Sequence, residues 1–279
     1  MLSYKHGFHA GNFADVHKHM VLVQLINALN QKPKPWSYLE THGGKAHYDL
    51  TDEQAEKTGE YKKGIAPVWA AAQPPTLVAN YLAQVSAENT GRLLRYYPGS
   101  PAIAANMARE DDRIAIMELH ANEYELINKY FKRNTQVAIH HRDGYEGVLS
   151  MLPPKPNRGV VLIDPSYEVK SEYQEVARFI KKAHQRWPIG VYAVWYPILE
   201  AGLHRAMLQS VASSGIRKIF VSEFYQKSSN SGRMFGSGMM LINPPWQLEE
   251  QLGSVMPWLE RTLAESDADS SSGRWLVPE

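Results

Sequence analysis

The sequence predicts an α/β protein with a mostly parallel sheet, a terminal antiparallel hairpin and a small helical insertion. Short apolar runs alternate with helical stretches along most of the 279 residues, which is typical of parallel strands joined by helices. The last two apolar runs have no helix between them, so we expect them to pair antiparallel at the sheet edge. Residues 49–98 break the alternation, because polar helical segments there are interrupted by Pro67, Pro74 and Pro75.

The first part of the chain should form a helix, a strand and then the helices of the insertion. Apolar residues from Val16 onward recur at helical spacing, and Pro33 follows the end of that pattern. The short strand leads directly into His42-Gly43-Gly44. The predicted ranges, in the order helix, strand, helix, helix, are 15–30, 36–41, 51–62 and 76–88.

The rest of the chain should alternate strictly until the final hairpin. The expected strands are 113–118, 136–140, 159–163, 189–195, 216–224 and 239–243. The expected helices are 122–131, 144–151, 171–186, 200–210 and 246–263. A parallel sheet that ends in a hairpin is the shape of Rossmann-like methyltransferases. We therefore expect such a domain over 1–48 and 99–279, an insertion subdomain over 49–98, and a solvated linker over 266–273.

Composition restricts the classes of function. The net charge is +1, so a nucleic-acid partner would need basic residues gathered on one face. The absence of cysteine excludes disulfides, thiolate metal sites and the cysteine nucleophile used to methylate carbon 5 of pyrimidines. No apolar run has the length of a signal peptide or of a membrane span. We expect a cytoplasmic monomer with no membrane partner.

The sharpest chemical signal follows the buried run 159–163, which leads into Asp164-Pro165-Ser166-Tyr167. Ligands of open α/β sheets bind at the carboxyl ends of strands. A carboxylate and a backbone carbonyl can each accept one N–H of an adenine amine, which turns its lone pair toward a methyl donor. Asp164 and the carbonyl of Pro165 suit those roles, and Tyr167 could stack on an extruded base. The plain alternative is a strand end followed by a turn.

Three other strand ends carry weaker signals. The run from Glu40 to Gly44 ends in two glycines, which would let the backbone approach a ligand closely, although a plain turn is equally compatible. Glu118 stands where a carboxylate often binds a ribose diol, and it could instead be a capping or solvated acid. Asp143-Gly144 could hold an adenine ring or form a simple turn.

The N-terminal segment suggests an RNA-contacting arm. Residues 1–12 have no strong periodicity but interleave Tyr4, Lys5 and further aromatic and histidine side chains. Such a mixture suits a flipped base and its flanking phosphates. We expect Tyr4 at the base and Lys5 and Lys18 at phosphates. The alternative is an arm that packs on the sheet.

The eleven histidines do not predict a metal site. His17 and His19 are two residues apart, which places them on different faces of a helix. No carboxylate stands at an obvious ligand spacing from the paired histidines. We expect no metal, and expect His19 and His42 to line a cofactor pocket as hydrogen-bonding groups.

Taken together, the motifs resemble the J-type bacterial 23S ribosomal RNA adenine-N6 methyltransferases over nearly the whole chain. The matching pieces include 2–6, 8–12, Asp15, 18–19, 41–42, 97–101, Asp164-Pro165 with Tyr167, 195–197, 236–239 and 242–246. The resemblance implies S-adenosyl-L-methionine as cofactor, 23S ribosomal RNA as substrate and Tyr4 as an RNA contact. The cofactor contacts that it implies are His19, His42, Ser100, Glu118, Asp143, Gly144 and Asp164.

Two residues depart from the family pattern. Ser166 stands where the family has a second proline, so the backbone loses a fixed φ angle while the Pro165 carbonyl is kept. Lys45 is bulkier than the small residues expected in its loop, and it must point away from a cationic sulfonium. The alternatives are a DNA adenine-N6 methyltransferase and a catalytically silent RNA-binding or cofactor-sensing domain.

Overall fold

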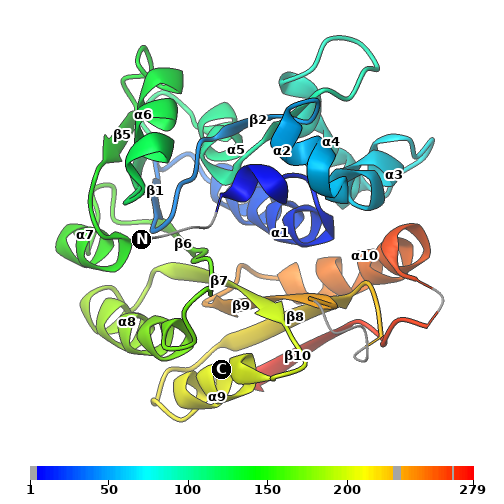
Figure 1. The fold of residues 1–279 in the computed structure, drawn as a ribbon. Coiled ribbons are helices and arrows are strands. Elements are labelled where there is room, and N and C mark those ends of the chain that lie inside the picture. Colours follow the sequence, from blue (N-terminus) through cyan, green and yellow to red (C-terminus); the bar gives the residue numbers. More distant parts are fainter. Residues whose placement is uncertain (1–4, 229–233, 266) are drawn as a thin grey trace.

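The computed structural model describes residues 5–228, 234–265 and 267–279, and it confirms the predicted fold class (Figure 1). The described residues form an eight-stranded sheet. Five neighbouring strands are parallel, and β9, β8 and β10 continue the sheet antiparallel on one side. In spatial order the strands are β10 (Ser272–Val277), β8 (Ile219–Tyr225), β9 (Gly236–Ile242), β7 (Val191–Ile198), β6 (Gly159–Ile163), β1 (Ser37–Glu40), β4 (Arg113–Met117) and β5 (Val137–His140).

Helices cover both faces of this sheet. In β6, Val160 and Leu162 pack into one core, whereas Val161 and Ile163 pack into the other, which explains why the whole run is apolar. The helices of the first core are α1 (Phe13–Asn30), α5 (Ser100–Met107), α6 (Ala121–Tyr130) and α10 (Leu248–Leu263). Those of the second core are α7 (Gly144–Met151), α8 (Glu172–Arg186) and α9 (Leu203–Ala212).

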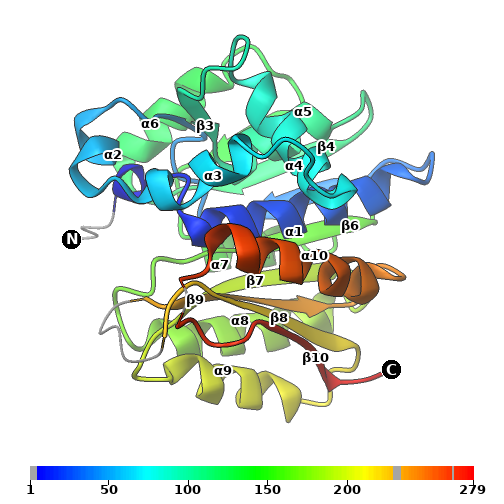
Figure 2. The same ribbon diagram turned by 90° about the vertical axis from the view of Figure 1, so that its right-hand side faces the viewer.

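The insertion lies over α1, on the side away from the sheet (Figure 2). Its elements are β2 (His47–Asp49), α2 (Glu53–Thr58), η2 (Glu60–Lys63), α3 (Ile65–Trp69), α4 (Thr76–Ala87) and β3 (Tyr96–Pro98). Helix α1 is therefore enclosed by the sheet on one side and the insertion on the other, and nearly all of its side chains are buried. A helix in such a position can be apolar around its whole circumference.

Three predictions in the first half of the chain were wrong in detail. The helix predicted over 51–62 is broken at Gly59, whose φ of 62° is left-handed. Strands β2 and β3 pair antiparallel at the base of the insertion, and at three residues each they are too short to show a period. Helix α5 was not predicted; Pro101 occupies its first turn, where the missing N–H of proline costs no helical hydrogen bond.

The C-terminal part needs one further correction. Residues 266–273 are not simply a linker, because β10 begins at Ser272 and pairs antiparallel with β8. Residue 266 itself lies outside the described residues. Strand β9 is inserted between β7 and β8, so the predicted hairpin exists but β10 forms the sheet edge.

Candidate functional site

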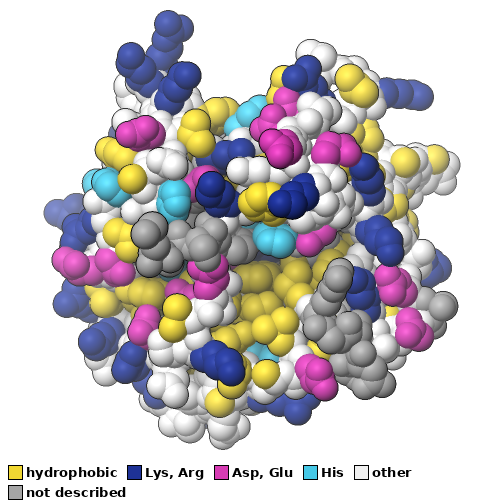
Figure 3. All heavy atoms as spheres, viewed as in Figure 1, with side chains coloured by type: hydrophobic (Ala, Val, Ile, Leu, Met, Phe, Trp, Pro, Cys, Tyr) yellow, Lys and Arg dark blue, Asp and Glu magenta, His cyan; other side chains and the backbone are white. Residues whose placement is uncertain are grey.

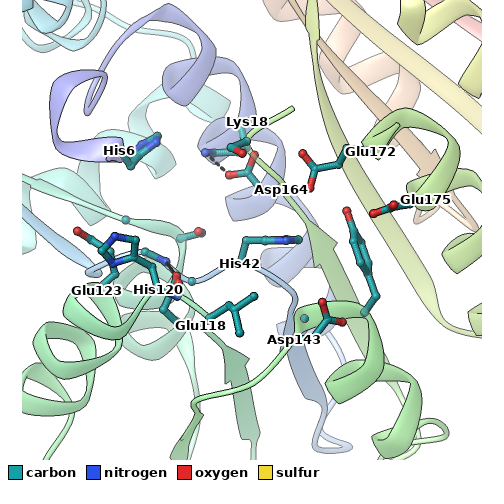
Figure 4. Close-up of a pocket in the computed structure, with 18 of the residues that line it drawn as sticks. His6, Lys18, His42, Glu118, His120, Glu123, Asp143, Asp164, Glu172 and Glu175 are labelled. Atoms are coloured by element: carbon teal, nitrogen blue, oxygen red, sulfur yellow. Dashed lines mark hydrogen bonds and ion pairs between the residues drawn. The ribbon is translucent and has the colours of Figure 1, made fainter. Parts of the chain in front are cut away.

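A hollow of about 340 Å³ opens at the carboxyl ends of the parallel strands; we call it the first hollow (Figure 4). Its wall is built by the segments that follow β1, β4, β5 and β6, together with the first turn of α5 and part of α1. All seven residues predicted to bind a cofactor line it, although they come from six separate segments of the chain: His19, His42, Ser100, Glu118, Asp143, Gly144 and Asp164.

Glycines let the strand ends approach one another in this wall. Gly44 has a φ of 60°, and its N–H donates to Oε2 of Glu118 over 2.8 Å. A Cβ atom on Gly144 would lie 1.9 Å from the carbonyl oxygen of Thr41, so only glycine fits there. Lys45 lies over the ring of Tyr48 at 5.1 Å and does not line the first hollow, as its charge required.

Glu118 lies in the wall, as predicted, and it also joins the loop after β1 to the loop after β4. Its side chain is buried, and its two oxygens accept the backbone N–H groups of Gly44 and His120, at 2.8 and 2.6 Å. Burial raises its pKa, although the two backbone hydrogen bonds oppose that rise. A carboxylate oxygen has two lone pairs, so each can still accept one hydrogen bond from a ligand.

Two histidines of the wall, His19 and His42, are held neutral. Burial lowers the pKa of His42 to about 4 and that of His19 well below its ordinary value. Nδ1 of His19 lies 2.8 Å from the Tyr97 hydroxyl, whereas its buried Nε2 has no hydrogen-bond partner in the described part of the chain. A buried ring nitrogen without a partner is costly unless a ligand supplies one.

Glu40, the last residue of β1, is a buried acid for which the sequence predicted no role. Its side chain is fully buried and accepts hydrogen bonds from the hydroxyls of Ser100 and Tyr38. Burial raises the pKa of Glu40 to about 8. Glu40 therefore anchors the first turn of α5, which places Ser100 in the wall.

Asp164 is bound to a lysine that the sequence analysis assigned elsewhere. Nζ of Lys18 lies 2.6 Å from Oδ2 of Asp164 (Figure 4). The same Nζ lies 2.9 Å from Oδ1 of Asp15. Burial opposes the charge of Lys18, but the two carboxylates outweigh burial and raise its pKa. Lys18 is 3% exposed, so the expectation that it contacts a surface phosphate is corrected.

A second hollow, of about 1060 Å³, lies between the insertion and the ends of β7 and β8. Pro165 and Tyr167 line it together with Phe13, Trp195, Pro197, Leu199 and Met234, which make its floor apolar and aromatic. Figure 3 shows apolar side chains gathered at the centre of this face. The two hollows share His6, Lys18, Asp164 and Ser166 in their walls, so they meet at the Asp164 carboxylate.

Tyr167 is fixed more firmly than its predicted stacking role suggested. Its hydroxyl donates to the carbonyl of Trp195 over 2.8 Å, and its N–H donates to Oε2 of Glu172 over 2.7 Å. Its ring packs against Tyr173 with centroids 4.4 Å apart and is 7% exposed. A ligand in the second hollow can therefore contact only a small part of this ring.

The described structure does not test the RNA contacts predicted for Tyr4 and Lys5. Tyr4 lies outside the described residues. Lys5 is exposed at the start of η1 (His6–Phe8). His6 was part of the matching motif but had no predicted role, and its Nε2 lies 2.9 Å from Oδ2 of Asp15. Asp15 and Lys18 stand three residues apart on a helix, a spacing at which opposite charges pair. This spacing is the signal in the sequence that could have indicated an inward-facing Lys18 near the reaction centre.

Within the described ranges, no three metal-ligating side chains gather in a way that could hold a metal ion. The helices in those ranges are all too short or too polar to cross a membrane.

Comparison with known proteins gives the family. Residues 33–277 match the protein family described as "Ribosomal RNA large subunit methyltransferase D, RlmJ". Proteins named "Ribosomal RNA large subunit methyltransferase J" from Escherichia coli (strain K12) and Haemophilus influenzae are each 41% identical to the chain, with both partners covered over 100% of their lengths. A crystal structure of a Legionella pneumophila protein matches with a TM-score of 0.89 at 36% identity, covering 96% of this chain and 98% of that one. The match to the family therefore extends over most of the chain, and the chain belongs to the RlmJ family of large-subunit ribosomal RNA methyltransferases.

Proposed function

We propose that this protein transfers a methyl group from S-adenosyl-L-methionine to the exocyclic amine of one adenosine in 23S ribosomal RNA. The observation that carries the proposal is the position of Asp164. It follows the buried strand β6 in an Asp-Pro-x-Tyr sequence and lies where the two hollows meet. One hollow can then hold the methyl donor and the other the acceptor, with the carboxylate between them.

The first hollow suits the cofactor. S-adenosyl-L-methionine supplies an electrophilic methyl group on a sulfonium. We assign the ribose to Glu118 and the adenine ring to Asp143 and Gly144. The unpartnered Nε2 of His19 can then find a hydrogen-bond partner, and neutral His19 and His42 add no positive charge beside a cationic sulfonium.

Asp164 and Pro165 orient the acceptor amine. Lys18 contacts Oδ2 of Asp164, and we assign the other oxygen to one N–H of the adenine amine. The carbonyl of Pro165 accepts the second N–H. These two acceptors turn the nitrogen lone pair toward the methyl group, and the carboxylate stabilises the positive charge that develops on nitrogen.

Lys18 positions this carboxylate. Its Nζ lies 2.6 Å from Oδ2 of Asp164, so the carboxyl group is held in place beside the acceptor amine. Lys18 is in turn held by Asp15, so its charge is compensated whether or not the substrate is bound.

The second hollow would receive the adenosine. Its apolar floor suits a base removed from its stack, and Trp195 lies close enough to Lys18 to border the reaction centre, with 5.8 Å between Nζ and the ring centroid. Pulling a base from its stack costs a few kcal/mol, which contacts with an aromatic floor can offset in part.

The remaining proposals concern organisation. We propose residues 49–98 as an insertion subdomain, and residues 1–48 with 99–279 as the methyltransferase domain with its N-terminal RNA-contacting arm. All groups assigned above come from one chain, so we propose a monomer. It would act on ribosomal RNA in the cytoplasm.

The decisive test is mass mapping of N6-methyladenosine in ribosomal RNA from cells with and without this protein. The proposal requires one modified site to disappear with the protein and to return with the purified enzyme. Transfer to DNA but not to ribosomal RNA would show a DNA methyltransferase instead. Binding of S-adenosylhomocysteine without transfer to either would show a silent cofactor-sensing domain.

A further inference from the structure

Lysines border the second hollow on the side of the insertion. Lys57 lies in the last turn of α2, Lys62 and Lys63 end η2, and Lys227 follows β8 on the opposite side; we call these four residues the lysine rim. Figure 3 shows Lys and Arg side chains beside the apolar centre on the side toward α2 and α3. This grouping is not visible in the sequence, because Lys227 is more than 160 positions from the other three.

Each acid of the second hollow has a partner other than Lys57, Lys63 and Lys227, so these three rim lysines keep their charge. Asp15 and Asp164 share the charge of Lys18. Glu60 accepts hydrogen bonds from His9 and from the amide of Asn12, both at 3.0 Å. Glu56 pairs with Lys62 at 2.8 Å, which leaves the other rim lysines without a counter-charge inside the hollow.

The rim lysines are available to a ligand. Lys57, Lys62 and Lys63 are exposed, and Lys63 reaches Glu265 only at 3.4 Å, with 74% of its side chain exposed. Exposed ion pairs of this kind contribute little to stability and are easily exchanged for another anion. Lys57 lies 5.9 Å from the ring centroid of Phe8, a contact that leaves its charge unneutralised.

The rim is also held in a fixed place relative to the reaction centre. Nε2 of the buried Gln226 donates to the carbonyl of Lys63 over 2.9 Å. The Gln226 carbonyl accepts the N–H of Glu265 over 2.7 Å. This residue therefore ties η2 to the end of β8, and it closes the border of the hollow between the insertion and the sheet.

The volume of the hollow indicates more than a single base. Pockets that enclose one drug-sized molecule span about 300–1,000 Å³. This hollow has about 1060 Å³, with the four rim lysines at its border and the buried Lys18 at the reaction centre. An apolar floor with a cationic border matches a strand whose bases point inward and whose phosphates remain at the surface.

We propose that the lysine rim binds the phosphates of the nucleotides that flank the target adenosine, so that the RNA strand passes between the insertion and the end of β8. This rests on the proposed function, because it takes RNA as the substrate. The insertion is then part of the RNA-binding surface and not only a cover for α1.

The test compares two triple variants of equal charge. The rim variant is Lys57→Ala with Lys62→Ala and Lys63→Ala. The control is Lys32→Ala with Lys34→Ala and Lys182→Ala, since these lysines are equally exposed but lie beyond the amino ends of the strands or on α8. Binding of a 23S ribosomal RNA fragment is measured as a function of salt for both variants and the unchanged protein.

Three phosphate contacts to a single strand contribute about 2 to the slope of log affinity against log salt concentration. We expect the slope of the rim variant to be smaller by about that amount. Its loss of affinity relative to the unchanged protein should therefore be about twentyfold greater at 50 mM salt than at 200 mM salt. The control should keep both slope and affinity, and all three proteins should bind S-adenosylhomocysteine equally. Equal slopes for rim variant and control would overturn the proposal.

Two further results separate the possible failures. Poly-glutamate serves as a competitor of the RNA. If it displaces the RNA from the unchanged protein and from the control variant, and if the rim variant binds neither polymer, the rim is a general polyanion-binding surface. The RNA assignment then falls. If the unchanged protein binds RNA through the rim but methylates none, the proposed function fails while the rim is upheld.

Discussion

Removing the charge of Lys18 tests the electrostatic design of the reaction centre. The substitution Lys18→Met keeps much of the side-chain volume and leaves Asp15 and Asp164 without their shared cation. Breaking a buried ion pair by removal of one partner costs about 3–5 kcal/mol. For a chain of this size that corresponds to a fall in Tm of about 6–20 °C, measured by calorimetry at pH 7.

The pH dependence gives the prediction a second readout. Burial opposes the charge of Asp15, but His6 and Lys18 outweigh it and hold its pKa well below the ordinary value. A lowered carboxyl pKa contributes stability that is present above about pH 4 and is lost as the pH falls through the folded-state pKa. The raised pKa of Lys18 contributes stability below about pH 10.4, lost as the pH rises further. The deficit of the variant should therefore be largest between these limits and shrink below pH 4.

The matched control is Lys62→Met, which breaks an ion pair of similar length, 2.8 Å, on the surface. It should leave Tm unchanged, because both partners are solvated. Lys18→Arg, which keeps the charge, should recover part of the loss. The reasoning is refuted if Lys18→Met and Lys62→Met have the same Tm, or if the deficit of Lys18→Met is constant from pH 3 to pH 7.

Four shorter predictions concern the two hollows. Asp164→Ala should fold but lose methyl transfer by about 30- to 5000-fold, the equivalent of about 2–5 kcal/mol in the transition state, as single-turnover assays would show; near-normal turnover would rule out the assigned mechanism. Glu118→Ala should weaken S-adenosylhomocysteine binding at least about tenfold by calorimetry, because it removes a charge-assisted acceptor and also frees the Gly44 loop; unchanged affinity would make Glu118 a structural acid only. Tyr4→Ala should impair RNA methylation at constant cofactor affinity, whereas a joint fall of Tm and both affinities would indicate an arm that merely packs on the sheet. Activity should survive exhaustive EDTA treatment, and a loss restored by zinc would contradict the metal-free assignment.

The sequence was most informative where its pattern followed the period of a long or buried element. The run 159–163 is apolar at every position because β6 is buried on both faces, so both the strand and the acid at its end could be located. The same reasoning failed for β2 and β3, since three residues cannot display an alternation. It also failed for β10, where polar residues and Gly273 concealed a strand that pairs along only one of its edges.

The sequence predicted which residues form the candidate site, but not which hydrogen bonds and ion pairs join them. The strand-end rule and the family motif indicated which residues gather, and the structure brings all seven predicted cofactor contacts to one hollow. Neither could show that Lys18 turns inward to Asp164, because its partner is 146 positions away and lysine is ordinarily a surface residue. The role of Gln226 was hidden for the same reason, since it depends on how the insertion lies against the sheet.

The C-terminal strand has a consequence for how the molecule behaves in concentrated solution. Sheet edges with unpaired backbone groups are templates on which other chains can add. Strand β10 occupies the free side of β8, and its own register shifts between Trp275 and Val277, while Arg274 keeps 45% of its side chain in solvent. Irregular, charged borders of this kind are poor templates for further strands. Strand β10 thus covers the edge of β8, and we expect a version shortened before Ser272 to present the apolar β8 to its neighbours and to self-associate more readily.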